Sequence, residues 1–301
     1  MTVLHRRPSR LRKPGSGVPY LLLAPAAVLF ALILGYPLVK LLVLSFQDFG
    51  LRALFTGTAE WVGADNYSEL ATDDEFLPVL VRTIVFCAAL VAGTLAIGMG
   101  VALMMVRLGK RMRTAVTLVL ITAWAVPSVA ATLIWQWLFQ PLYGVVNWAL
   151  GAGQHDWLAT PLSAFSIVWL LVVWQSVPFV ALTLYAGLSQ IPREYYEAVA
   201  IDGAGPVQAF RAITLPFLRP ILLLVTILSV IWDFNVFNQL WILTRGGPQG
   251  GTTTLSILSF TKAFSGNAYG QGAAIAVVAV VLLMGLTAYY VRRLVRSGEE
   301  L

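Results

Sequence analysis

The chain has 301 residues, of which 58% are hydrophobic and only 11% are charged. A soluble domain carries about 25% charged residues, so an ordinary soluble fold is excluded and lipid must be the solvent for much of the surface. The single cysteine, Cys87, excludes a disulfide within the chain and argues against a cysteine-based metal site. The net charge of +6 would suit nucleic acid, but the basic residues are distributed over the loops in a pattern that indicates membrane topology instead.

Six apolar stretches are long enough to cross a membrane. A helix needs about 20 mostly apolar residues to span the hydrocarbon core, and its backbone polar groups must be satisfied internally there. In chain order the stretches are 20–46, 79–106, 114–138, 163–188, 217–243 and 270–291. We therefore expect an all-α integral membrane protein with six transmembrane helices, divided into a basic cytoplasmic tail at 1–17 and a transmembrane domain at 18–297.

The first stretch could instead be the core of a cleaved signal peptide. Such a core has about 7–15 apolar residues followed by a small-residue cleavage site, whereas this run is much longer and leads into Tyr36-Pro37. Arg6-Arg7 could also be interpreted as a twin-arginine export signal, but the five basic residues before the run are scattered. We expect a retained first span with its anchor on the cytoplasmic side.

Lysine and arginine in the loops indicate how the spans are oriented, because cytoplasmic loops carry an excess of these residues. Fifteen basic residues lie in the N-terminal tail, the second and fourth loops and the C-terminal tail. The other three loops hold only Arg52, Arg245 and Lys262. We therefore expect both termini to be cytoplasmic.

The fourth loop, 191–216, has the composition of two short helices with a sharp turn between them. Pro192 suits a helix start, because its missing N–H would be unpaired there anyway. Asp202-Gly203 is a turn signal, and Gly203 is free to take a positive φ angle. Pro206 can open a second helix, which we expect to end at Leu215-Pro216 just before the fifth span. The apolar residues of this loop need a cover, from the protein's own helix ends or from a partner.

This loop closely resembles the EAA loop of permease subunits of bacterial ABC importers. The family pattern is E-A-A-x-x-D-G-A, followed by F, I, L-P and P at fixed spacing. Val199 replaces the family's second alanine and adds two methyl groups at a packed position. The matching residues are Glu197, Ala198, Asp202, Gly203, Ala204, Phe210, Ile213, Leu215, Pro216 and Pro220.

Other segments are similar to the carbohydrate-uptake branch of these permeases, the maltose and glycerol-phosphate type. Pro178-Phe179 in the fourth stretch and the run from Leu243 to Pro248 after the fifth carry this resemblance. The resemblance implies the transmembrane domain of a type I ABC importer in a bacterial plasma (inner) membrane, importing a sugar such as a di- or oligosaccharide.

The resemblance also implies partners. Two permease subunits would sit side by side, and each would insert its loop into a cytoplasmic ATPase dimer. That dimer would bind ATP and Mg, so this chain would hold no cofactor itself. An extracellular solute-binding protein would deliver the sugar, membrane lipid would surround the spans, and no nucleic acid would be involved.

The loop residues acquire expected roles from the same resemblance. Glu197 and Asp202 would order the loop, Gly203 would permit the bend, and the alanines would allow close approach. The alternative is that the motif only stabilises its own turn. The expected ATPase-coupling residues are Glu197, Ala198, Ala200, Asp202, Gly203, Ala204, Phe210 and Pro216.

Polar side chains in the fifth stretch suggest a substrate pathway, because polar groups inside a span are costly. Drawn as one helix at 100° per residue, four of them share an arc of about 120°: Trp232, Asn235, Asn238 and Gln239. An aromatic ring beside amides suits a sugar, since the ring packs on C–H faces while amides hydrogen-bond to hydroxyls. Asp233 would point nearly the opposite way, toward the partner permease or Arg82. The amides could instead only bond neighbouring helices.

Several other functions find little support in the sequence. No phosphate-binding Gly-x-x-x-x-Gly-Lys-Ser/Thr string occurs, so we expect no ATPase site and no catalytic residues in this chain. His5 and His155 lack metal-ligand spacing, so no metal site is expected.

A stand-alone secondary transporter or channel, using an ion gradient with Asp233 as its ion site, is the main alternative, although no internal repeat is evident. An intramembrane enzyme has only Asp233 in its favour.

The charge of the substrate can also be inferred. A phosphate-bearing substrate would require basic residues in the pathway, and Lys40 and Arg82 are the in-span candidates. Both lie near the outer ends of their spans, so a neutral saccharide is favoured.

Overall fold

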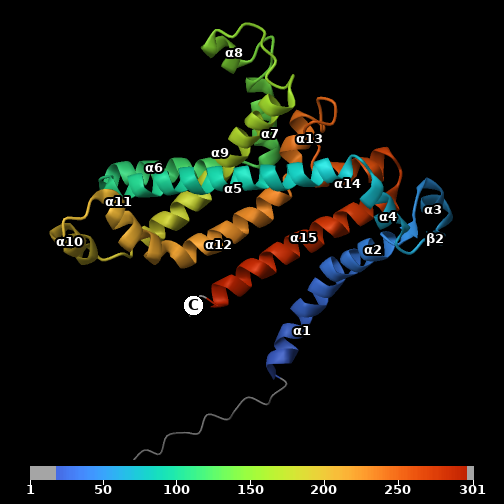
Figure 1. The fold of residues 1–301 in the computed structure, drawn as a ribbon, viewed down its shortest axis with the longest axis horizontal. Helices are drawn as coiled ribbons and strands as arrows, with labels where there is room; N and C mark the ends of the chain where they lie inside the picture. Colours follow the sequence, from blue (N-terminus) through green and yellow to red (C-terminus); the bar gives the residue numbers. More distant parts are fainter. Residues whose placement is uncertain (1–17, 297–301) are drawn as a thin grey trace, which may run out of the picture.

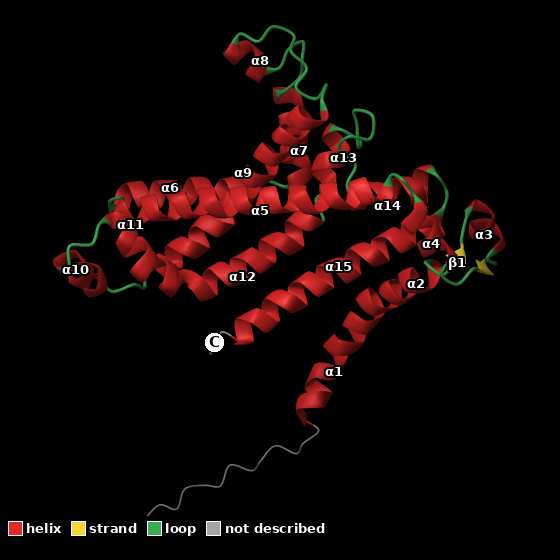
Figure 2. Cartoon of the chain, in the orientation of Figure 1, coloured by secondary structure: helices red, strands yellow, loops and turns green. Residues whose placement is uncertain are grey.

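The structure is a computed structural model that describes residues 18–296. It is mostly helical, with two very short strands at one end (Figures 1 and 2). The predicted basic tail at 1–17 and residue 297 of the predicted transmembrane domain lie outside the described residues.

The chain begins with one long apolar helix in three segments: α1 (Val18–Phe30), a π-helical turn (Ala31–Gly35) and α2 (Tyr36–Leu44). The π-helical turn ends two residues before Pro37. Because proline lacks an N–H and its ring crowds the preceding turn, a widened turn accommodates it within a continuous helix. This helix leans away from the other helices and meets them through α2, which packs on α15 (Figure 1).

A small polar cap follows at one end of the molecule. It comprises β1 (Gln47–Asp48), α3 (Leu51–Thr56), β2 (Glu60–Trp61) and α4 (Asp65–Thr72), with the two strands pairing antiparallel. The buried Asn66 holds the cap together by donating hydrogen bonds to the carbonyls of Ser45 and Gln47, each at 3.0 Å. Lys262 Nζ lies 2.9 Å from Asp73 Oδ2, and this hydrogen bond lowers the pKa of Asp73 below its usual value.

Helices α5 (Phe76–Arg107) and α9 (Pro161–Leu188) form the centre of the fold and pack along each other. Leu90 of α5 and Leu171 of α9 are completely buried in the same cluster. Thr160 caps α9 by accepting a hydrogen bond from the Ser163 N–H, which satisfies one of the unpaired donors of its first turn. Both helices are long and apolar, as the hydropathy of the sequence predicts.

The third predicted stretch is not one straight helix. It consists of α6 (Lys110–Trp124) and α7 (Ser128–Leu138), which meet at an angle of 94°. Pro127 lies in the three-residue break, where it cannot donate a backbone hydrogen bond. After α7 the chain forms α8 (Val145–Leu150) at the tip of a protrusion and returns through α9 (Figure 1).

The second helix of the fourth loop does not end at Leu215-Pro216, contrary to the sequence prediction. After α10 (Arg193–Ile201), α11 (Pro206–Ala209) continues through a π-helical turn (Phe210–Thr214) into α12 (Leu215–Phe234). As with Pro37, the π-helical turn ends two residues before a proline, here Pro216, which the widened helix accommodates. The fourth loop and the fifth span therefore share one continuous helix.

The fifth stretch is also interrupted. Helix α12 ends at Phe234, residues 235–237 are non-helical, and α13 (Asn238–Leu243) resumes the helix. The chain then forms α14 (Leu255–Phe260), a π-helical turn (Thr261–Ser265) and α15 (Tyr269–Arg296). The sequence contains no proline or glycine at this break, so its position was not predicted.

Within residues 18–296, five helical segments are long and apolar enough to cross a membrane, or six if the bent α6–α7 pair counts as one span. The five are Tyr20–Leu44, Phe76–Arg107, Pro161–Leu188, Pro206–Leu243 and Tyr269–Arg292. Helix α10 lies at one end of the molecule and the polar cap with α3 and α4 lies at the other (Figure 1). The chain is therefore a helical multi-pass membrane protein, as predicted.

Candidate functional site

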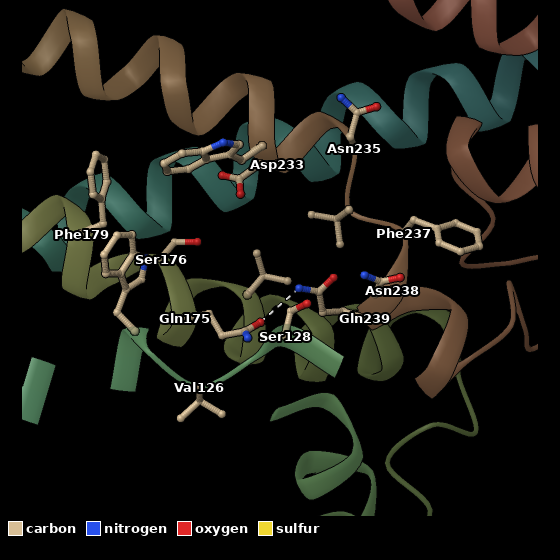
Figure 3. A pocket seen from close by; sticks show the side chains of 14 residues that line it. Val126, Ser128, Gln175, Ser176, Phe179, Asp233, Asn235, Phe237, Asn238 and Gln239 are labelled. Carbon is tan, nitrogen blue, oxygen red and sulfur yellow. Dashed lines mark hydrogen bonds between the residues drawn. The ribbon is translucent and has the colours of Figure 1, made fainter. Parts of the chain in front are cut away.

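A cavity of about 470 Å³ lies where the two broken spans meet. Its walls come from the α6–α7 break, from α9 and from the α12–α13 break (Figure 3). Irregular backbone at membrane depth is tolerated where it is buried in protein or lines a water-filled cavity. Interrupted helices around a central cavity are therefore a plausible place for a polar solute to cross.

Aromatic rings form one wall of this cavity. Phe179 of α9 stacks on Trp124 of α6 with ring centroids 5.9 Å apart, and it meets Trp232 of α12 edge-on at 5.3 Å. Trp232 is 49% exposed, so much of its ring is free to contact a solute. An aromatic face of this kind packs well against the C–H face of a sugar.

Amides and hydroxyls form the opposite part of the lining. Gln239 Nε2 donates a hydrogen bond to Gln175 Oε1 at 3.1 Å, so this pair joins α13 to α9 across the cavity (Figure 3). Ser128 and Ser176 contribute hydroxyl groups, and Asn238 adds an exposed amide. These groups can donate to and accept from the hydroxyls of a solute.

The structure places all four predicted pathway residues on this cavity: Trp232, Asn235, Asn238 and Gln239. The helical projection behind the prediction was nevertheless wrong, because α12 ends at Phe234 and the chain turns before α13. The Asn235 amide donates back to the Ile231 carbonyl at 3.2 Å and points away from the cavity centre (Figure 3). Its amide is therefore not directed at a solute in the middle of the cavity.

The expectation for Asp233 is contradicted by the structure. Asp233 lines the same cavity instead of facing away from it, and its side chain points inward (Figure 3). Arg82, one of its suggested partners, donates its Nη1 hydrogens to the carbonyls of Gly250 and Thr253 at 2.8 and 2.9 Å. This arginine therefore holds the loop before α14 and does not pair with Asp233.

The sequence prediction missed Trp124, Ser128 and Ser176 as lining residues. Trp124 and Ser128 flank Pro127, and the proline was a signal for a break at which side chains face a cavity. Ser176 lies one residue after Gln175 in α9, but nothing in its local pattern distinguishes it from a packed serine.

The predicted coupling loop forms a knob at the end of the molecule opposite the polar cap (Figure 1). Helix α10 ends in a Schellman motif, in which Gly203 N–H bonds to the Ala200 carbonyl and Ala204 N–H bonds to the Val199 carbonyl. Gly203 has a φ angle of +80°, as the turn signal predicts. The D-G-A part of the motif thus has a direct structural explanation.

One face of the knob is attached to the protein and another is open. The Tyr196 hydroxyl forms a 2.8 Å hydrogen bond with Thr214, and Tyr196 and Val199 pack against the buried cluster that contains Ile213. Ile201, in contrast, is 86% exposed. The knob therefore has a fixed base and an apolar outer surface without a cover inside the chain.

The other expected coupling residues lie around this outer surface. Glu197, Ala198, Ala200 and Asp202 are exposed. Ala204 and Phe210 are half-buried, and Pro216 is exposed at the start of α12. Backbone hydrogen bonds close the turn next to them.

No group of three or more His, Cys, Asp or Glu side chains that could hold a metal ion occurs within residues 18–296. His155 packs edge-on against Trp157 with centroids 4.6 Å apart. Both rings lie in the loop between α8 and α9.

Comparison with known proteins gives the family. Residues 92–298 match the model of the binding-protein-dependent transport system inner membrane component. The chain is 45% identical to the diacetylchitobiose uptake system permease protein DasB of Streptomyces coelicolor over 96% of this chain and 90% of that protein. It is 32% identical to the trehalose/maltose transport system permease protein MalF of Thermococcus litoralis, over 94% of this chain and 96% of MalF.

A solved structure shares the fold. A chain of a bacterial ABC transporter involved in the import of the acidic polysaccharide alginate superposes with a TM-score of 0.80, at 20% identity, over 94% of this chain and 96% of that one. The match to the family model covers more than half of the residues, and it extends from α5 through the cavity and the knob to α15. The chain belongs to the family of inner membrane components of binding-protein-dependent transport systems.

Proposed function

We propose that the chain is the permease subunit of an ATP-driven importer that carries a saccharide through the cavity between its broken spans. The observation that carries this proposal is the cavity lining, in which aromatic rings face amides and hydroxyls. Sugars have apolar C–H faces and polar edges, so a site that offers both kinds of contact suits them. The relatives named for diacetylchitobiose and trehalose/maltose uptake point to the same class of substrate.

The importer needs partners that this chain does not contain. In our proposal a second permease subunit completes the pathway, a solute-binding protein delivers the sugar from outside, and a cytoplasmic ATPase dimer with ATP and Mg drives transport. The exposed surface around Ile201 on the knob is the contact with the ATPase. An apolar side chain that is 86% exposed at a helix end is the kind of residue that a partner covers.

A stand-alone transporter driven by an ion gradient is not favoured. A binding-protein-dependent system receives its substrate from a separate protein, and the family assignment covers the cavity as well as the knob. The assembled system should therefore take up sugar only when ATPase and binding protein are both present.

The test is uptake by the complete complex in proteoliposomes, with N,N′-diacetylchitobiose as the first sugar of a panel. We expect uptake to depend on ATP and on the binding protein. Trp232→Ala should reduce sugar uptake about tenfold or more, because it removes the exposed ring of the aromatic wall, whereas Trp232→Phe should retain much of the rate. Normal uptake by Trp232→Ala, or transport of no saccharide in the panel, would contradict the proposal.

A further inference from the structure

Asp233 is the one cavity-lining group that the aromatic and amide contacts leave unexplained. It lies in the last turn of α12, is only 4% exposed, and directs its carboxylate into the cavity (Figure 3). Its Oδ2 atom is buried and accepts no hydrogen bond from any side chain or backbone group of residues 18–296. A buried carboxylate oxygen without a donor is rare in folded proteins and calls for an explanation.

The surroundings of Asp233 offer no countercharge. Of the side chains that line the cavity, drawn from α6, α7, α9, α12 and α13, Asp233 is the only acidic or basic one. Arg82 is bound to loop carbonyls, and the Gln175 and Gln239 amides bond to each other. Because Asp233 lines the cavity, a solute in the cavity can supply donors to its carboxylate.

An unpaired, buried carboxylate oxygen raises the free energy of the folded protein when the cavity is empty. Leaving a buried acceptor unpaired costs its full desolvation free energy, which is larger for a charged group than for a neutral one. The same carboxylate becomes a strong recognition element when donors reach it, because hydrogen bonds to ionised groups are stronger than neutral ones. A second anion in the cavity would be repelled.

We propose that Asp233 determines which saccharides pass: it accepts hydrogen bonds from hydroxyl or amino groups of the sugar and excludes acidic saccharides. This inference rests on the proposed function and adds the charge class of the substrate. Family membership does not determine the charge of the substrate, because a transporter with the same fold is involved in the import of an acidic polysaccharide. Asp233 gives this chain its own selectivity against such substrates.

The experiment measures the affinity of the complete complex in lipid nanodiscs for three disaccharides of matched length, by equilibrium dialysis. The probes are N,N′-diacetylchitobiose, which is neutral, chitobiose with free amines, which is cationic, and the 6-carboxylate of diacetylchitobiose, which is anionic. We expect the wild-type complex to bind the anionic sugar at least about tenfold more weakly than the neutral one. The cationic sugar should bind at least as tightly as the neutral one.

Asp233→Asn replaces the carboxylate by an amide of the same shape. It should bring the neutral and anionic affinities within about threefold of each other and weaken the cationic sugar about tenfold. Asp233→Glu keeps the charge and should preserve the order of the three sugars. Asp74→Asn makes the same chemical change at an exposed site near the polar cap and should leave all three affinities unchanged.

Two results would overturn the inference, and they have different meanings. If Asp233→Asn retains the wild-type order, water alone satisfies Asp233 and the residue does not select the substrate. If the wild-type complex binds none of the disaccharides but transports another class of solute, the proposed function itself fails.

Discussion

At the scale of single residues, glycine decides how closely the central helices approach. A Cβ atom placed on Gly98 of α5 would lie 2.6 Å from Val180 Cγ1 and 2.9 Å from Val180 Cβ on α9. Val180 is almost completely buried, so it has little room to move. Gly100, two residues later in the same helix, has no atom within 4 Å of such a Cβ.

This contrast predicts different stabilities for two variants. Gly98→Ala should destabilise the protein by about 1–3 kcal/mol, because the extra methyl group overpacks the α5–α9 contact. Gly100→Ala should be neutral or slightly stabilising, because alanine favours the helix and meets no neighbour. Thermal unfolding of the purified chain in detergent compares the two. Equal melting temperatures would show that the α5–α9 contact adjusts without cost.

The sequence alone could not reveal which neighbours these single residues face. Gly98 and Gly100 lie in the same apolar run, and no local pattern indicates that one faces α9 and the other does not. Asp233 is a similar case, because its direction depends on where α12 ends. The residue types were visible in the sequence, whereas their surroundings depended on the tertiary structure.

At the scale of elements, the apolar stretches were predictable from the sequence. Of the two interruptions within them, the break between α6 and α7 was more predictable than the break between α12 and α13. Hydropathy locates spans because each must supply about 20 apolar residues to lipid. Pro127 gave a physical reason for the break between α6 and α7. The break at residues 235–237 has no proline or glycine, so the fifth stretch looked like one helix and the projection misplaced Asp233.

The knob illustrates an element whose turn was predictable in detail. Gly203 closes the Schellman motif with a φ of +80°, a region in which only glycine is comfortable. The continuation of α11 into α12 was not predictable, because a proline at 216 ordinarily indicates a helix boundary and the widening of the preceding turn gives no sequence signal.

The turn therefore predicts how the knob responds to substitution. Gly203→Pro should abolish sugar uptake, because proline cannot adopt a positive φ and loses the N–H that bonds to the Ala200 carbonyl. Gly203→Ala should cost about 1 kcal/mol of local stability and reduce uptake partly. Both variants should still insert into the membrane, since no span changes. Uptake and sugar-stimulated ATP hydrolysis in proteoliposomes provide the measurement.

Gly205→Ala is the matched control for these variants. Gly205 is equally exposed and has equally open space around it, but its φ is −74°, which any residue can adopt. We expect wild-type uptake from Gly205→Ala. If Gly203→Pro transported normally, the bend would have no part in coupling.

At the scale of the whole molecule, the apolar exterior shows that the chain is designed for surroundings other than water. None of the most apolar 18-residue window in Tyr20–Leu44 is buried within the chain. Leucine, valine and phenylalanine side chains are exposed along this helix. In water this surface would be costly, so lipid or a partner within the membrane must cover it.

The orientation of the molecule in the membrane is the last prediction, and it follows from charge rather than from packing. Fifteen lysine and arginine residues lie in the tails and loops on one predicted side and three on the other, and such an excess marks the cytoplasmic side. Helix α10 and the polar cap lie at opposite ends of the molecule (Figure 1). We therefore expect the knob inside the cell and Glu60 of the cap outside.

Single cysteines test this orientation directly, because Cys87 is buried and should react slowly. In right-side-out vesicles a membrane-impermeant maleimide should label Glu60→Cys at once. Ile201→Cys, which is on the exposed surface of the knob, should be labelled only after the membrane is disrupted, and the unmodified chain gives the background from Cys87. Labelling of Ile201→Cys in intact vesicles would place the knob outside the cell, where no ATPase could reach it, and would remove the basis for coupling through α10.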